Sequence, residues 1–234
     1  MKPQSSSDRL NDCEQMKTQE ENKIIVSNIA LEHGFDTFNS LDNEALRFIM
    51  IRDASTLLDE HPDNEEVEGY FRLVARAGVL DPDIVVRSNA FVCLADLHDE
   101  VDLCWLLSGL NDVDADVRAV CVQGIRWIEK KSNAKYVLPL LRDRAVEVRG
   151  LVILSVPELL SKPKAAKALY DHLSMEKNPT LRAICYYFLL SKSLADKDLE
   201  AKVKMELNAE PQSVRSRTEK LKSGKDPDEL LSEL

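Results

Sequence analysis

The stretch "DVDADVRAVCVQGIRWI", from Asp112 to Ile128, decides the fold, because its acidic opening leads into a helical pattern and recurs along the chain. The opening returns as "DPDIVVRS" from Asp81 and as "DRAVEVRG" from Asp143. In each copy the aspartate stands six places before an arginine that follows an aliphatic residue. The recurrence indicates either a repeated catalytic motif or a repeated structural unit, and the spacing distinguishes the two.

Aligned on the aliphatic–arginine pair, the copies recur at intervals of 31, 31, 33 and 33 residues, and Leu46-Arg47 adds a copy 40 residues before the first. A period in the low thirties marks a stack of supersecondary units, each of which needs neighbours to bury its apolar face. The aligned arginines are Arg87, Arg118, Arg149, Arg182 and Arg215.

Small and apolar residues after each arginine fall on one arc of a helix with about 3.6 residues per turn. Cys93, Cys121 and Cys185 lie on this arc and are predicted to be small core residues. An apolar segment such as "AKYVLPLLR" precedes each acidic turn, so each unit is predicted to be helix, turn, helix. Asp114 and Pro82 suit the cap and first turn of a second helix.

These features resemble the HEAT-repeat family, and "YVLPLLRDRAVEVRGLVILSVPELL" (Tyr136–Leu160) matches it best. The resemblance covers about residues 23–222, some 85% of the chain. It implies an all-α fold, an α-solenoid of about six helix-turn-helix repeats in a right-handed superhelix, with second helices lining the inner face.

The resemblance also implies that turn carboxylates and helix arginines form a structural ladder between successive turns, not a catalytic site. Arginine suits this role because its guanidinium holds several carboxylate and carbonyl oxygens in fixed geometry. Carried over by position, the pairs are Asp81 with Arg87, Asp112 with Arg118, Asp143 with Arg149, and Glu176 with Arg182. Near Arg215 the carboxylate position holds Ala209, with Glu210 beside it.

Composition favours a folded, cytoplasmic protein: 44% of the 234 residues are hydrophobic, 31% are charged, and no long apolar run suggests a membrane span. The net charge of −10 argues against nucleic acid and anionic membrane as partners. Residues 1–102 carry net −13 and residues 103–234 net +3, so the acidic part is suited either to solubility or to steering a basic partner.

Two end segments fall outside the predicted repeat domain of residues 23–222. Residues 1–22 are polar and are predicted to be flexible. Residues 223–234, "SGKDPDELLSEL", are predicted to form a C-terminal tail that either caps the last repeat or contacts a partner. The acidic loop "HPDNEEVEG" precedes a helix predicted to begin near Glu65.

We expect no catalytic, cofactor-binding or metal-ligating residues. The five cysteines lack CxxC spacing, and the histidines His33, His61, His98 and His172 lie in different units and are interpreted as surface residues at helix ends. No phosphate-binding glycine loop or nucleophile motif occurs. HEAT-like lyases and DNA glycosylases stay open as less favoured enzymatic alternatives.

The arc opposite the core carries apolar and aromatic residues with one arginine, a composition typical of an interface centre. Either this stripe binds a partner, or its members pack between adjacent second helices. Pro157 is predicted to bend its helix. The stripe comprises Val92, Gln123, Arg126, Trp127, Leu154, Glu158, Tyr187 and Leu190.

The sequence therefore predicts a non-enzymatic adaptor, scaffold or assembly factor that holds a segment of another protein on the concave face. The alternative is a dedicated inhibitor, such as an immunity protein that occludes a basic toxin or nuclease. Neither reading predicts an oligomeric state.

Overall fold

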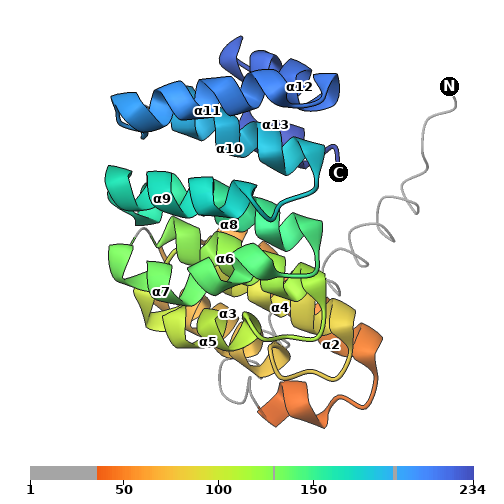
Figure 1. Cartoon of the computed structure of the whole chain (residues 1–234). Coiled ribbons are helices and arrows are strands. Elements are labelled where there is room, and N and C mark those ends of the chain that lie inside the picture. The colour runs from red at the N-terminus through yellow and green to blue at the C-terminus, as the bar shows by residue number, and fades with distance from the viewer. Residues whose placement is uncertain (1–35, 129, 192–193) are drawn as a thin grey trace, which may run out of the picture. The chain divides into compact units, whose positions relative to one another are not determined.

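The computed structural model describes residues 36–128, 130–191 and 194–234, which form helices and turns without any strand (Figure 1). The prediction of an all-α fold is therefore confirmed for this part of the chain. By contact density the chain divides into two compact units, Met1–Ala90 and Phe91–Leu234. The predicted flexible segment 1–22, Cys13 and His33 lie outside the described residues.

The first unit contains α2 (Glu44–Glu60), α3 (Glu65–Gly78) and the start of α4 (Ile84–Asp96). Helices α2 and α3 pack against each other. The side chain of Asn64 accepts hydrogen bonds from the backbone N–H groups of Glu66 and Val67, which caps α3 and confirms the helix predicted near Glu65. Asp83 caps α4 in the same way, so Pro82 precedes the cap and is not in the first turn.

The second unit consists of helix pairs in which α6, α8, α10 and α12 are the second helices. Each packs against the helix before it, and α6 packs on α8, α8 on α10, and α10 on α12 (Figure 1). The elements are η1 (Glu100–Asp102), α5 (Leu103–Gly109), α6 (Ala115–Trp127), η2 (Lys131–Asn133), α7 (Ala134–Val137), η3 (Leu138–Arg142), α8 (Val146–Leu159), α9 (Lys162–Leu173), α10 (Pro179–Ser191), α11 (Lys197–Ala209), α12 (Gln212–Lys222) and α13 (Pro227–Leu231).

Local chemistry explains where these helices begin and break. Asp114 caps α6 as predicted, accepting hydrogen bonds from the N–H groups of Asp116 and Val117. The segment "AKYVLPLLR" forms only four residues of α-helix before η3, because Pro139 at the start of η3 has no N–H to continue the α-helical bonding. Pro157 lies inside α8.

Close packing in the second unit depends on small residues at the helix contacts. A Cβ atom on Gly124 would lie 2.7 Å from the Cβ of Ala95, and one on Gly109 would lie 2.3 Å from the Sγ of Cys121. The predicted core cysteines, Cys93, Cys121 and Cys185, are all buried. Burial raises the pKa of the Cys93 thiol to about 12, which leaves it protonated and unreactive at neutral pH.

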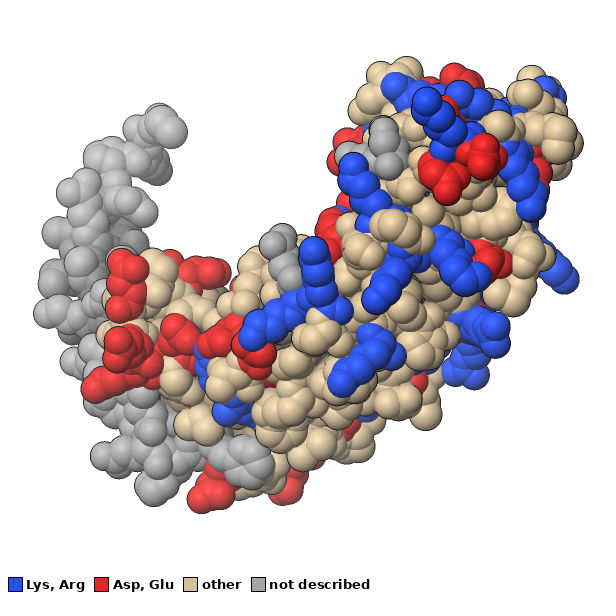
Figure 2. Space-filling model, turned by 60° about the vertical axis from the view of Figure 1, so that its left-hand side comes forward, with Lys and Arg blue, Asp and Glu red and all other residues tan. Residues whose placement is uncertain are grey.

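Charge is distributed unevenly on the surface. A broad area of the face in Figure 2 carries Lys and Arg side chains with few Asp or Glu among them. Exposed Lys162, Lys164 and Lys167 on α9 are part of the positive excess of residues 103–234. Within the described ranges, none of the helices combines the length and apolar content needed to cross a bilayer.

Candidate functional site

Arginines at the starts of the second helices join one turn to the next. Arg118 donates from Nε and Nη2 to both carboxylate oxygens of Asp143, at 2.8 and 2.7 Å. Its Nη1 donates to the backbone carbonyl of Asp112 at 2.9 Å. One guanidinium therefore ties the side chain of the following turn to the backbone of its own turn, which is the two-pronged geometry that favours arginine over lysine.

The same arrangement repeats along the Phe91–Leu234 unit. Arg149 binds the Glu176 carboxylate at 2.7 and 3.0 Å, and its Nη1 donates to the Asp143 carbonyl at 2.9 Å. Arg182 binds the Glu210 carboxylate and donates to the Glu176 carbonyl at 2.7 Å. We call this set, Arg118, Asp143, Arg149, Glu176, Arg182 and Glu210, the arginine ladder.

Within the first unit, Arg47 makes the equivalent contacts, to the Asp81 carboxylate at 2.5 and 3.2 Å and to the Leu41 carbonyl at 2.8 Å. Arg87 donates to the carbonyl of Asp81 at 2.7 Å.

The ladder corrects the pairing expected within each copy. Arg87, Arg118, Arg149 and Arg182 contact Asp81, Asp112, Asp143 and Glu176 through the backbone carbonyls of these residues. The carboxylates of Asp81, Asp143 and Glu176 instead accept from the arginine of the preceding copy. The physical reason is the turn itself: the Asp143 carboxylate also accepts from the N–H of Ala145 at 2.8 Å, which fixes its direction.

Glu176 is the most enclosed member of the ladder. Its carboxylate accepts from Arg149, from the backbone N–H groups of Lys177 and Asn178 at 2.8 Å, and lies 3.1 Å from Nε2 of His172. Burial by itself would raise the pKa of Glu176, but these hydrogen bonds outweigh it and hold the pKa far below its usual range. The carboxylate is therefore ionised at neutral pH and serves as a structural anion.

The histidines differ from their interpretation as surface residues in one case. His172 is buried, with 3% exposure, and its Nδ1 has no hydrogen-bond partner among the described residues. His61 and His98 are exposed, and His98 adopts a left-handed backbone conformation with φ of 50°. Across the described segments, no cluster of three or more His, Cys, Asp or Glu residues has the arrangement of a metal site.

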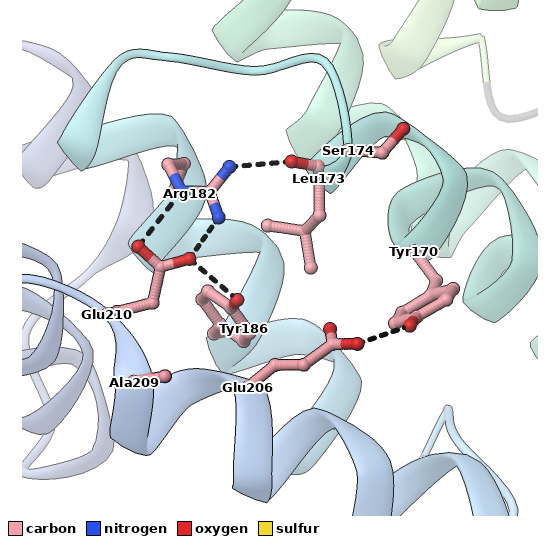
Figure 3. A pocket seen from close by; sticks show the side chains of 8 residues that line it. All are labelled: Tyr170, Leu173, Ser174, Arg182, Tyr186, Glu206, Ala209 and Glu210. Carbon is pink, nitrogen blue, oxygen red and sulfur yellow. Dashed lines mark hydrogen bonds and ion pairs between the residues drawn. The ribbon is translucent and has the colours of Figure 1, made fainter.

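A cavity of about 460 Å³ opens beside the last members of the ladder (Figure 3). Tyr170 donates to Glu206 at 2.6 Å and Tyr186 donates to Glu210 at 2.8 Å, while Arg182 also donates to the Leu173 carbonyl. Burial, followed by the hydrogen bond to Glu210, raises the pKa of Tyr186. These lining side chains are hydrogen-bonded to one another between α9, α10 and α11. Their arrangement does not pair a nucleophile with a general base.

The predicted stripe is partly exposed and partly filled. Val92 and Trp127 are 38% and 39% exposed, and the Trp127 ring lies 4.7 Å from that of His98. Leu154 was expected to be exposed, and this prediction is wrong. Its side chain is 2% exposed, because α8 packs between α6 and α10 on that side. Tyr187 and Leu190 are half-buried against the apolar cluster of the second unit, which includes Ile153, Leu181 and Ile184.

The polar members of the stripe contact one another and the C-terminal tail. Arg126 binds both carboxylate oxygens of Glu158 at 2.7 and 2.8 Å, and its Nη1 lies 3.2 Å from Oδ1 of Asp228 on α13. The hydrogen bonds that Arg126 donates to Glu158 are the main cause of the raised pKa of Arg126, and Asp228 adds to it. Gln123 is half-buried, and its Oε1 is enclosed without a hydrogen-bond donor in the described part of the chain.

The tail helix α13 packs against α8 and α10, which sequence reasoning did not foresee (Figure 1). Leu230 is 1% exposed and belongs to the apolar cluster of the second unit. Leu231 lies against Gly150 of α8. We call the surface beneath α13, formed by Arg126, Glu158, Gly150 and the adjoining apolar side chains of α8 and α10, the tail site.

Comparison with protein-family models finds no match to this chain, and comparison with curated proteins finds none either. The HEAT resemblance therefore depends on the spacings and residues of this chain alone.

Proposed function

We propose that the chain is a non-enzymatic protein-binding module of the HEAT-like kind, built as an α-solenoid of about six helix pairs in a right-handed superhelix. Its task would be that of an adaptor, scaffold or assembly factor. The recurring period of the sequence and the arginine ladder both support a repeated unit. The number and hand of the pairs follow from the resemblance.

One observation carries the proposal: the second helices already hold a short helix. Helix α13 covers only five residues, yet it places Leu230 in the apolar cluster and Asp228 beside Arg126. A surface that accepts a short helix through two leucines and one charge pair has the properties of a helix-in-groove binding site. The partly exposed residues Val92, Gln123 and Trp127 extend the surface beyond the tail.

Position-specific photo-crosslinking in cells that produce the chain tests this proposal. A photoreactive amino acid at Trp127 or Glu158 is expected to form covalent adducts with another protein, because both side chains are exposed on the second-helix side. The matched control is Lys167, which is exposed on the first helix α9. Adducts from both test positions that are no different from those of the control would overturn the proposal.

Two substitutions refine this experiment. Arg126→Glu removes the cation of the stripe and Tyr187→Ala removes a half-buried aromatic ring, so each is expected to reduce the adducts formed from Trp127. An inhibitor of a basic toxin or nuclease receives less support at this surface, because Arg126 favours a carboxylate over a cation.

A further inference from the structure

The position of α13 distinguishes a bound segment from a cap. A cap would cover the open side of the last helix pair, α11 and α12, whereas α13 packs on α8 and α10. Helix α12 ends before it: Gly224, at φ of 110°, and Lys225 donate back to the carbonyls of Leu221 and Lys220. The chain then reverses and starts a separate helix at Pro227, with Asp226 as its cap.

Gly150 gives the tail site its shape. A Cβ atom there would lie 2.2 Å from Cδ1 of Leu231, so the leucine would have to shift before a larger residue could replace the glycine. The place directly after the aligned arginine holds no glycine in the other copies, where the residues are Phe48, Ser88, Ala119, Ala183 and Ser216. Glycine inside a helix weakens it relative to alanine, and at this one copy the small residue coincides with the close approach of Leu231.

The charge pair between Arg126 and Asp228 fixes how α13 is aligned in the tail site. Arg126 uses two nitrogens for Glu158 and has Nη1 left for Asp228 at 3.2 Å, with its own side chain 16% exposed. Asp228 is 52% exposed, so the pair adds little affinity and mainly fixes which residue lies beside α6. The leucines two and three places later supply the apolar contact.

We infer that the tail site receives a short helix from a partner protein, recognised by a carboxylate followed two and three residues later by leucines. The tail is the intramolecular competitor for this site. The inference rests on the proposed function and specifies its partner class. Because α13 is tethered by a short linker, its effective concentration is in the millimolar range, and a partner helix binds tightly only when the tail is released.

A peptide titration with the full chain tests the inference. The probe is a fluorescent peptide of residues 223–234, and the opened variant carries Leu230→Ser and Leu231→Ser. Fluorescence anisotropy is expected to show binding to the opened variant at least about tenfold tighter than to the unchanged chain, because the tail no longer competes. A second peptide, an alanine-based helix with one Asp and two Leu at the same spacing, is expected to bind the opened variant as well.

Two further variants, made in the opened chain, locate the binding. Gly150→Ala is expected to weaken the binding of both peptides, because Leu231 must move away from α8, and thermal melting checks that the fold is retained. Arg126→Glu is expected to lower the affinity for the tail peptide by about two- to fivefold. A tail peptide that carries Asp228→Arg is expected to recover that affinity.

Three results would overturn the inference. Neither peptide binds the opened variant although it is folded, only the tail peptide binds it, or adding Gly150→Ala to the opened variant leaves peptide binding unchanged. Failure here and failure of the proposed function are distinguishable. Crosslinks from Trp127 or Glu158 without peptide binding would retain the binding module and reject this partner class. Peptide binding without crosslinks would retain the site and reject the broader function.

Discussion

Glu176→Gln tests whether the arginine ladder stabilises the Phe91–Leu234 unit. The substitution keeps the size of the side chain but removes its charge, and it turns one acceptor oxygen into a donor opposite the guanidinium of Arg149. The Glu176 side chain is 1% exposed and that of Arg149 is 18% exposed, so the remaining cation is left with little water. Removing one partner of a buried pair costs about 3–5 kcal/mol, and the partial exposure of Arg149 favours the lower end, about 3 kcal/mol.

That loss is large enough to measure simply. For a chain of this size, about 3 kcal/mol lowers the melting temperature by about 6–12 °C. Urea unfolding followed by tryptophan fluorescence reports the relevant unit, because both tryptophans, Trp105 and Trp127, lie within Phe91–Leu234. The matched control is Glu147→Gln in the first turn of α8, an exposed position where the change is expected to be within about 0.5 kcal/mol.

The effect also has a defined dependence on pH. The pKa of Glu176 is lowered in the folded chain, so its stabilisation is fully present above the ordinary value of 4.5 and is lost as the pH falls towards the folded value. The difference between the unchanged chain and Glu176→Gln is therefore expected to be constant from pH 6 to 8 and to shrink below about pH 4.5. Equal stability of Glu176→Gln and Glu147→Gln at pH 7 would refute the reasoning.

Four other predictions follow from burial and packing. Leu154→Ala is expected to lower the free energy of unfolding by about 2–5 kcal/mol in urea titrations, whereas a loss under about 1 kcal/mol would mean that the residue is not in the core. In a Cys13→Ser background, Cys104 is expected to react rapidly with a thiol reagent in the native chain, while the three buried cysteines react only on unfolding; fast reaction of all four contradicts this. Gly69→Ala is expected to stabilise by about 0.5–1 kcal/mol, because a Cβ there meets nothing within 4 Å. Gly109→Ala is expected to destabilise by about 1–3 kcal/mol through its clash with Cys121, and thermal melting with the same sign for both glycines would contradict the packing argument.

The sequence by itself determined the helical fold and the core arcs of the second helices. A periodic apolar arc can be predicted without a partner, because helical spacing fixes which side chains share a face. Val148, Val152 and Val156 are all buried on α8, as their spacing around Arg149 predicts. Local capping at Asp114 was also readable, since it depends only on neighbouring residues.

Only the tertiary structure decided which copy each carboxylate serves and what covers the second helices. Asp143 lies six residues before Arg149 and 25 residues after Arg118, yet its carboxylate binds Arg118, because stacking places successive turns side by side. Leu154 and Gly150 became understandable only with α10 and α13 packed against α8. Contacts between residues far apart in the chain depend on how whole helices pack. The spacing of residues within one helix predicts which face is buried but not which helix covers it.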